Sequence, residues 1–525
     1  MLVAVLLTGS RSCSALDTQT HRRQVETLVP STEERDILLD DQGWPSGRNG
    51  SRRGRRSKYV TRNLTEGSIP RNLWFLAWPQ VVEGAMRVMD QLADLVWAGH
   101  GIGTRAIAGM GVAQQYTQMA FLARQGIDTG MRAMVSRAVG MGNMQLANLV
   151  VLQAGTLTLA FALIMTVIGV LFTEEMLGLL GISDEVIALG ATYMRIHFVG
   201  QAVTGFQNLG GHALAASGDT LTPMKANVVA RVLHIVLSPL LMFGWIGLPA
   251  LGLPGAAVAN IIAHAVSLVL ILAALFRGGS RLHLSMSGYR FDWPILRRLL
   301  KVGGPASVNS MERSLAQLVL VGLVAPFGDY ALAAYALTRR VEMFANLGSQ
   351  GLGQASGIIV GQNLGAGKPE RARQTVLWAA GYVTVVKAIL GAVLFAFPAA
   401  LLTIFSSDAE LLAVAQIWLR IQVVGYVAMG IGQVAMQSFQ TAGDTIVPMI
   451  VTLVSIWGIQ QPLAFMLPNV AGLGQYGIAW AVVLAMAARP LFYIPYFFSG
   501  RWLRVRLLEE PEGEGVGRGV RARTD

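Results

Sequence analysis

Residues 79–97 read PQVVEGAMRVMDQLADLVW and, together with the preceding WFLAW, form an apolar segment long enough to cross a bilayer. A transmembrane helix needs about 20 consecutive, mostly apolar residues. Four charged residues nevertheless recur at helical spacing, so that one helical face carries Glu83, Arg87, Asp90 and Asp94. Charged groups at bilayer depth are costly and mark ion or substrate paths. The segment therefore predicts a functional transmembrane helix, with a purely structural Glu83–Arg87 pair as the alternative.

The composition indicates a polytopic membrane protein. Hydrophobic residues make up 53% of the 525 residues, charged residues only 14%, and the mean hydropathy is +0.51. Soluble domains usually carry about 25% charged residues. The single cysteine, Cys13, excludes an intramolecular disulfide framework and a cysteine-based metal site. The chain contains no GxxxxGK[ST] motif, so by itself it is not predicted to be an ATP-driven pump.

Apolar segments separated by short breaks with Gly, Pro or charged residues follow one another from residue 72 onward. We predict twelve transmembrane helices, at 72–97, 105–135, 146–172, 186–215, 221–243, 251–276, 296–324, 331–360, 371–398, 411–440, 446–468 and 474–498. Several of these segments exceed the minimum span, so we expect them to tilt or to extend beyond the bilayer.

The charges of the connecting loops predict the orientation. Basic residues concentrate after the even-numbered segments and in both tails, whereas acidic residues such as Glu174 and Asp408 lie in the opposite loops. Cytoplasmic loops are enriched in Lys and Arg, so both termini are predicted to be cytoplasmic in a multi-pass protein of the plasma or inner membrane. The net charge of +11 fits these loops, and no nucleic-acid partner is predicted because no RNA-binding signature accompanies the charge.

An internal repeat relates the two halves of the chain. The motif GDTLTPM at 218–224 recurs as GDTIVPM at 443–449, and GMG at 140–142 recurs as GAG at 365–367, in both cases 225 residues later. Locally, the Gly of the longer motif is expected to end one helix and its Asp or Thr to cap the next. Pro is expected in the first turn of that next helix.

Two homologous six-helix halves follow from this repeat. Six is an even number, so both halves have the same topology and the substrate site is expected between them, near the bilayer midplane. The predicted organisation is a disordered, basic cytoplasmic N-terminal tail at 1–70, an N-terminal lobe at 71–276, a cytoplasmic inter-lobe loop at 277–294, a C-terminal lobe at 295–498 and a cytoplasmic C-terminal tail at 499–525.

The stretch YALTRRVEMFANLGSQGLGQASGIIVGQNLGAGKPERA at 335–372 resembles the eighth helix and following loop of the multidrug and toxic compound extrusion (MATE) transporters. Matching fragments in the first half are LAWPQ at 76–80, ADLVWAG at 93–99 and SRAVGMGN at 136–143. The resemblance covers roughly residues 72–504. It implies an all-α polytopic membrane protein whose twelve transmembrane helices form two homologous six-helix lobes in a V shape. It also implies export of bulky, often cationic compounds, driven by inward Na⁺ or H⁺.

The resemblance also implies a coupling-ion site in the N-terminal lobe. Asp94 matches the family's first-helix acid, and the other residues of the predicted site are Asp90, Asn208, His234, Ser238 and Asn260. Where relatives carry Asn and Asp, or a second Asn, in the fifth helix, this chain has His234 and Ser238. A histidine that titrates near neutral pH favours proton coupling, although a packing histidine is the alternative. Binding of Na⁺ at Asp94 is the alternative to proton coupling, and no other metal is predicted.

A second group of residues is predicted to line the substrate cleft: Glu83, Arg87, Glu312, Arg339 and Glu342. Glu312 stands one residue away from the helix-7 acid of a sodium-coupled branch, and Arg313 occupies the aligned position. Arg339 and Glu342 could instead form a structural ion pair. Pro79 is predicted to be a hinge in the first helix.

The second helix adds charges at helical spacing. Asp128 lies four positions from both Arg124 and Arg132, which predicts a neutralised structural ladder. Together with Arg87 and Arg195, these residues make the N-terminal lobe more basic than a cation exporter requires. An anionic or zwitterionic substrate is therefore an alternative to a cationic one.

The predicted function is secondary active antiport. The protein would export drugs or toxic organic compounds in exchange for inward H⁺ (or Na⁺), by alternating access between two lobes, with the coupling ion at Asp94. The alternative is a flippase for a lipid-linked precursor from the same superfamily. A membrane enzyme is disfavoured because the acidic residues are scattered through the spans rather than clustered at one face. The predicted partners are the lipid bilayer and small organic substrates, with no cofactor, and the protein is predicted to be a monomer.

Overall fold

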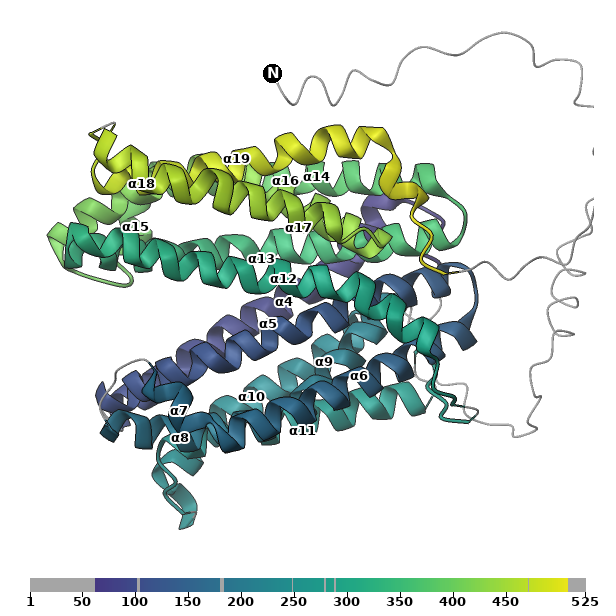
Figure 1. Cartoon of the computed structure of the whole chain (residues 1–525), viewed down its shortest axis with the longest axis horizontal. Coiled ribbons are helices and arrows are strands. Elements are labelled where there is room, and N and C mark those ends of the chain that lie inside the picture. The colour runs from purple at the N-terminus through teal and green to yellow at the C-terminus, as the bar shows by residue number, and fades with distance from the viewer. Residues whose placement is uncertain are drawn as a thin grey trace, which may run out of the picture. The chain divides into compact units, whose positions relative to one another are not determined.

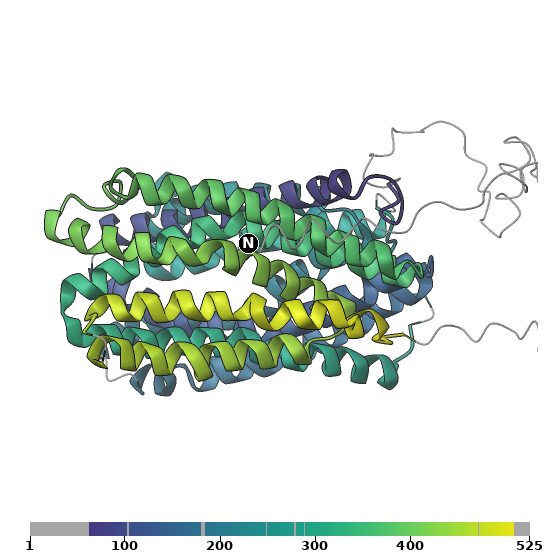
Figure 2. The same cartoon turned by 90° about the horizontal axis from the view of Figure 1, so that it is seen from above.

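The computed structural model describes residues 62–101, 104–179, 184–247, 249–277, 280–287, 289–470 and 472–508. Throughout these residues the regular structure is helical, and they contain no strand. The helices run side by side along the length of the bundle (Figures 1 and 2). The all-α fold predicted from the sequence is confirmed.

The described residues of the first half contain seven long helices and one short helix. They are α4 (Ile69–Gly101), α5 (Thr104–Gly140), α6 (Met144–Leu171), the short α7 (Thr173–Gly178), α8 (Asp184–Val199), α9 (Gln201–Ser217), α10 (Leu221–Phe243) and α11 (Leu253–Phe276). The predicted segment 186–215 is divided between α8 and α9 at Gly200. Gly is a weak helix former, which favours a break at this position. Hydropathy alone did not predict the break, because the segments on both sides are mainly apolar.

The second half repeats the pattern. It contains α12 (Trp293–Val324), α13 (Asp329–Gly365), α14 (Pro369–Ala396), the short α15 (Pro398–Leu402), α16 (Ala409–Ala442), α17 (Ile446–Leu453), a π-helical stretch (Val454–Gln460), α18 (Gln461–Val470) and α19 (Gln475–Ser499). Each of the twelve predicted ranges overlaps one of these helices or an unbroken run of helical segments. Seven of the described helices are long and apolar enough to cross a membrane by length and composition. That all twelve cross it stays a prediction.

The repeated GDTxxPM motifs adopt the same local structure in both halves. Gly218 and Gly443 end α9 and α16 in the left-handed conformation, with φ of 106° and 101°. Asp219 Oδ1 then accepts a hydrogen bond from the Thr222 backbone N at 3.0 Å, and Asp444 Oδ1 accepts one from the Val447 N at 3.2 Å. The predicted role of the motif, to end one helix and cap the next, is confirmed.

The two halves meet along α4, α5, α12 and α13, which lie between the remaining helices of each half (Figure 1). Glycines permit close backbone contact at this junction. A Cβ built on Gly126 of α5 would lie 2.2 Å from the Gly303 carbonyl oxygen of α12. A Cβ built on Gly351 of α13 would lie 3.1 Å from the Ala77 carbonyl oxygen of α4.

The tightest contact joins the ends of α5 and α13 and involves the repeated glycines. A Cβ on Gly140 would lie 2.0 Å from the Gln362 carbonyl oxygen, and a Cβ on Gly365 would lie 2.1 Å from the Arg137 carbonyl oxygen. Gln362 stands 225 residues after Arg137, so the repeat relates the two contacts to each other. We call this region, formed by residues 136–140 and 361–365, the closed end of the bundle.

Parts of both predicted tails pack at the same end. Leu64, within the predicted disordered tail 1–70, is buried among second-half residues. Leu507 and Leu508, within the predicted tail 499–525, are buried in a cluster of mainly first-half residues. Arg137 donates a hydrogen bond to the Val505 carbonyl oxygen at 2.5 Å. The tails are therefore structured from residue 62 onward and up to residue 508, because their apolar residues are buried against both halves. The lobe boundaries stay a prediction, and residues 1–61 and 509–525 lie outside the described residues.

Candidate functional site

A cavity of about 180 Å³ lies between the two halves, where the repeat predicted the substrate site. Its walls come from α4, α5, α9 and α10 on one side and from α12, α13 and α16 on the other. A second cavity of about 390 Å³ adjoins the first, because Arg87, Arg313 and Gln350 line both. We call the two together the central cavity.

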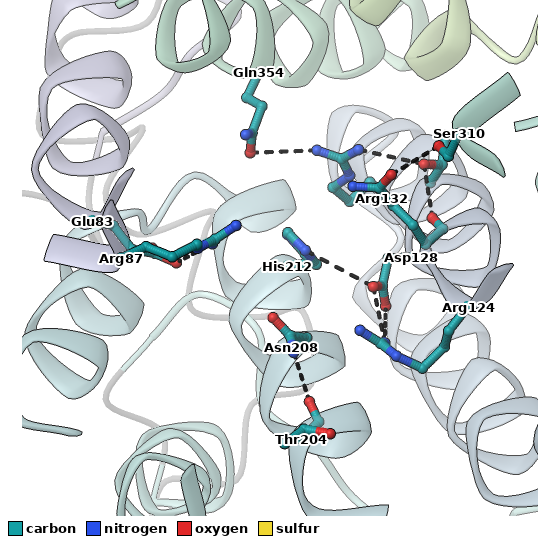
Figure 3. A network of polar contacts seen from close by, with 12 residues as sticks. Glu83, Arg87, Arg124, Asp128, Arg132, Thr204, Asn208, His212, Ser310 and Gln354 are labelled. Atoms are coloured by element: carbon teal, nitrogen blue, oxygen red, sulfur yellow. Dashed lines mark hydrogen bonds and ion pairs between the residues drawn. The ribbon is translucent and has the colours of Figure 1, made fainter. Parts of the chain in front are cut away.

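Charged and amide side chains from both halves face this cavity (Figure 3). Glu83 and Arg87 of α4 form an ion pair at 3.4 Å, as the structural alternative predicted, and both line the cavity as the cleft prediction stated. Arg132 of α5 donates to Gln354 Oε1 of α13 at 3.5 Å, a hydrogen bond between the two halves.

The predicted ladder on α5 forms only in part. Arg124 donates two hydrogen bonds to Asp128, at 3.1 and 2.9 Å, and both side chains are about 1% exposed. His212 Nε2 of α9 lies 4.0 Å from Asp128 Oδ2. Arg132 instead hydrogen-bonds to Gln354 and Thr129. Its side chain is therefore directed to the central cavity rather than only to its own helix.

The position of Arg195 corrects the prediction that this residue adds to the basic character of the N-terminal lobe. It is half-buried and forms an ion pair with Glu174 at 2.7 Å. The reason is that α7, which carries Glu174, packs against α8. Arg195 is not among the residues that line the central cavity, so its charge does not contribute there.

In the second half, Arg339 and Glu342 of α13 form an ion pair at 2.7 Å and both line the cavity. The two residues therefore form the ion pair given as an alternative and also line the cavity. Glu312 is different: it is buried on α12 and is not among the lining residues, whereas Arg313 lines both parts of the cavity. Consecutive residues of a helix point about 100° apart, so an arginine faces the position where an acid was expected.

A buried cluster lies further along α4, among residues of the first half. Asp90 is 3% exposed, and its Oδ1 lies 2.6 Å from His234 Nδ1 of α10. Its Oδ2 accepts a hydrogen bond from Arg231 at 2.6 Å. The predicted proximity of Asp90 and His234 agrees with this geometry. Arg231 was missed, although its i, i+3 spacing from His234 places both on one face of α10 and was a usable signal. We call Asp90, Arg231 and His234 the α4–α10 cluster.

Three other residues of the predicted ion site, Asn208, Ser238 and Asn260, lie within the described residues. Asn208 lines the central cavity and donates to the Thr204 carbonyl oxygen at 2.7 Å. Ser238 is fully buried on α10 and donates to Met242 Sδ at 3.5 Å. Asn260 is half-buried on α11. The side chain of Asp94 lies outside the described residues. Whether Asn208 belongs to one ion site with Asp90 stays a prediction.

Pro79, the predicted hinge, lies inside α4, and the helix continues through it from Ile69 to Gly101. Proline removes one backbone hydrogen bond from a helix and disturbs the turn before it. The residue therefore weakens α4 immediately before the turn that carries Glu83. Whether the helix bends there during function stays a prediction.

The family model described as MatE matches the chain twice, at residues 79–240 and 305–466. Together the two matches cover more than half of the chain. The chain belongs to the MatE family. The matches begin 226 residues apart, next to the 225-residue offset of the sequence motifs, which agrees with two repeated halves. The predicted resemblance to the MATE transporters is confirmed.

Curated relatives span nearly the same length as this MATE protein. "Probable multidrug resistance protein YoeA" of Bacillus subtilis is 26% identical and covers 85% of this chain and 97% of its own. "Probable multidrug resistance protein NorM" of Thermotoga maritima is 23% identical, over 86% of this chain and 96% of its own. A protein of Shewanella oneidensis named "FAD transporter" is 27% identical, over 70% of this chain and 81% of its own.

Solved structures share the fold. A crystal structure of MATE in the bent conformation aligns with a TM-score of 0.77 at 21% identity, covering 83% of this chain and 96% of that one. A MOP superfamily transporter from Pyrococcus furiosus aligns with a TM-score of 0.78 at 21% identity, covering 85% and 98%. This MATE protein is accordingly a multi-pass membrane transporter rather than an enzyme, with a fold of two repeated lobes.

The α4–α10 cluster leads to a stability prediction. Arg231→Met would leave the buried Asp90 carboxylate without one of its two partners, and breaking a buried ion pair costs about 3–5 kcal/mol. Because the Arg231 side chain is 19% exposed, we expect a smaller loss, about 2–3 kcal/mol. The expected result is a lower midpoint of thermal unfolding in detergent.

Arg340→Met, at an exposed position on α13, is the matched control and should leave the midpoint unchanged. The double variant Asp90→Asn with Arg231→Met should lose less stability than the two single changes added together, because the two residues interact. A strictly additive loss would contradict the pairing.

Proposed function

We propose that this MATE protein is a secondary antiporter that exports small organic compounds in exchange for inward H⁺ by alternating access between its two lobes. It acts in the cell membrane as a monomer with both termini in the cytoplasm, and it needs no cofactor or nucleic acid. Membership of the family and the cavity between the lobes support transport of small molecules. The names of the relatives from Bacillus and Thermotoga support drug efflux.

The observation that carries the coupling proposal is that α4 contributes both to the central cavity and to the α4–α10 cluster. Glu83 and Arg87 line the cavity, and Asp90 is buried against α10 less than one helical turn after Arg87. Asp94 follows Asp90 by four positions in the sequence. Protonation in this part of α4 would alter how the helix packs and, through Glu83 and Arg87, would alter the cavity. Coupling of this kind requires that proton and substrate have different affinities in the two states.

The side chains that contact Asp90 support H⁺ rather than Na⁺ as the coupling ion. One carboxylate oxygen accepts a hydrogen bond from the Arg231 guanidinium, and the other lies 2.6 Å from an imidazole nitrogen of His234. A cationic guanidinium repels Na⁺ and occupies an oxygen that the ion would need. Histidine is the side chain that ordinarily titrates near neutral pH. In this mechanism Asp94 is the residue that takes up and releases the proton, and the α4–α10 cluster responds to its charge.

The closed end supports the proposed orientation and the alternating-access step. Arg137, Lys368 and Arg371 are gathered there, and their side chains hydrogen-bond to backbone carbonyl groups of both terminal segments. A concentration of basic residues is typical of the cytoplasmic side. Under this proposal the closed end faces the cytoplasm, and transport requires Gly140 and Gly365 to separate from the opposite lobe.

Uptake by proteoliposomes under separately imposed gradients tests the coupling ion. With a lumen made acidic, we expect accumulation of a substrate dye, chosen from a cationic and an anionic set that includes ethidium. Collapse of the pH gradient with nigericin should abolish the accumulation, and protein-free liposomes give the background. A Na⁺ gradient at constant pH should drive no accumulation of the dye. Accumulation driven by Na⁺ and indifferent to pH would contradict the proton-coupled mechanism.

A further inference from the structure

The walls of the central cavity carry more basic than acidic side chains. Within the described residues, the lining arginines are Arg87, Arg132, Arg313, Arg339 and Arg489, and the lining acids are Glu83 and Glu342. Both acids are already engaged. Glu83 pairs with Arg87 at 3.4 Å, and Glu342 pairs with Arg339 at 2.7 Å. Arg132, Arg313 and Arg489 therefore have no acidic partner on the cavity wall itself.

The acids behind the wall do not remove this excess. In the first half, the single carboxylate of Asp128 accepts two hydrogen bonds from Arg124 and also interacts with Arg132. In the second half, the single buried carboxylate of Glu312 interacts with both Arg313 and Arg489. Each lobe thus places three arginines against two carboxylates around the cavity, an excess of one positive charge from each side.

Two of the arginines have a hydrogen-bond donor that is not used within the described residues. The Nε atoms of Arg132 and Arg489 are buried and have no hydrogen-bond partner in the described part of the chain. Arg313 and Arg489 are close enough to interact electrostatically. In Figure 3, Arg87, Arg132 and His212 lie on different helices around the same space, with Gln354 opposite. Guanidinium groups bind carboxylate and phosphate groups with paired hydrogen bonds.

The rest of the lining is polar. The smaller part of the cavity is lined by eight glutamines: Gln80, Gln125, Gln207, Gln350, Gln354, Gln433, Gln437 and Gln440. Each amide can both donate and accept hydrogen bonds. Phe121 and Tyr335 are the aromatic residues lining the two parts of the cavity, among those the structure describes. Apolar cations are bound by aromatic faces and by carboxylates, and this wall offers few of the former and no unpaired one of the latter.

We infer that the central cavity binds polar organic anions, compounds with a carboxylate or phosphate group and further hydrogen-bonding groups, in preference to lipophilic cations. This inference rests on the proposed transport function, because it takes the central cavity as the substrate site. The anionic group lies among Arg132, Arg313 and Arg489, and the glutamines bind the polar remainder of the molecule.

A matched pair of dyes tests the inference on the purified full-length protein. Carboxyfluorescein and rhodamine 123 share a xanthene ring system but carry opposite charge. Fluorescence anisotropy at neutral pH measures their binding without any gradient. We expect carboxyfluorescein to bind more tightly, and Arg313→Gln to weaken its binding by about tenfold through loss of a charged hydrogen bond. Arg340→Gln, exposed and outside the cavity lining, should leave the affinity unchanged.

The charge reversal Arg313→Glu distinguishes a lost anion site from a general loss of binding. It should shift the preference toward rhodamine 123 instead of only weakening the binding of carboxyfluorescein. Equal or tighter binding of rhodamine 123 to the wild type, or failure of carboxyfluorescein to bind, would overturn the inference while leaving proton-coupled transport open. Binding of carboxyfluorescein that depends on Arg313, with no uptake under any gradient, would support the anion site and contradict the proposed transport. Inorganic phosphate and acetate as competitors distinguish the two anionic groups.

Discussion

Gly140→Ala is expected to reduce transport at least tenfold without preventing folding. The added Cβ would lie 2.0 Å from the Gln362 carbonyl oxygen, far inside van der Waals contact. The two backbones would have to separate by about 1 Å or more, because packed interiors leave little room for an extra methyl group. The closed end could then form only with strain, and the state closed on that side would become rare.

Two measurements report the effect of Gly140→Ala. Uptake under a pH gradient should fall, and a cysteine placed at Ser136, which is fully buried at the closed end, should react faster with a thiol reagent. Both use a background in which Cys13, the one native cysteine, is replaced by Ser. The symmetry-related Gly365→Ala should behave in the same way, because its Cβ would lie 2.1 Å from the Arg137 carbonyl oxygen.

Gly111→Ala is the matched control for the closed-end glycines. It lies in the same helix as Gly140, and a Cβ there would meet no atom within 4 Å. Transport and labelling should stay at wild-type levels in this variant. Normal transport and unchanged labelling in Gly140→Ala would mean that the closed end is not part of the transport cycle.

Asp94→Asn is expected to abolish gradient-driven transport while leaving expression and substrate binding intact. The change keeps the size of the side chain and removes the group proposed to take up the proton. Substrate binding should persist, because the cavity is lined by other residues, such as Arg87 and Arg313. Loss of an obligatory proton carrier should cost two or more orders of magnitude in transport rate.

Comparison with Asp90→Asn separates the two acids of α4. Asp90 is hydrogen-bonded to His234 and Arg231, so its amide variant should mainly lower the thermal unfolding midpoint and reduce transport only in part. The measurement is uptake under a pH gradient, normalised to the amount of reconstituted protein. Full activity of Asp94→Asn would remove this residue from the mechanism.

The sequence was sufficient to predict the helices and the repeat. Hydropathy placed most helix ends within four residues, and the GDTxxPM motifs were correctly interpreted as caps, since a helix cap depends only on neighbouring residues. The break at Gly200 and the π-helical stretch at 454–460 were not predicted, because both are local departures inside otherwise apolar segments.

The site was predictable only where one helix determines it. Glu83 with Arg87, and Arg339 with Glu342, were found from spacing along a single helix. Which residue of a helix faces a partner depends on the rotation of that helix, which the sequence alone leaves open. For this reason Glu312 was expected in the cavity where Arg313 lies.

Contacts between helices from different parts of the chain were beyond the sequence argument. The spacing of Arg231 from His234 shows that the two share a face of α10, but it does not show that this face packs against α4. The same holds for the contact between Gly140 and Gln362, whose closeness depends on how the two halves cross. The repeat marked these glycines as related without indicating that each packs against the other half.

The most direct test of the proposed antiport is to record substrate and proton movement in the same vesicles. Proteoliposomes containing the pH dye pyranine and an acidic lumen are given a transported anionic or cationic dye from outside. We predict that entry of the dye is accompanied at once by alkalinisation of the lumen in the wild type, and that both signals vanish in Asp94→Asn. Dye entry without any change in lumenal pH, beyond that of protein-free vesicles, would contradict proton-coupled antiport.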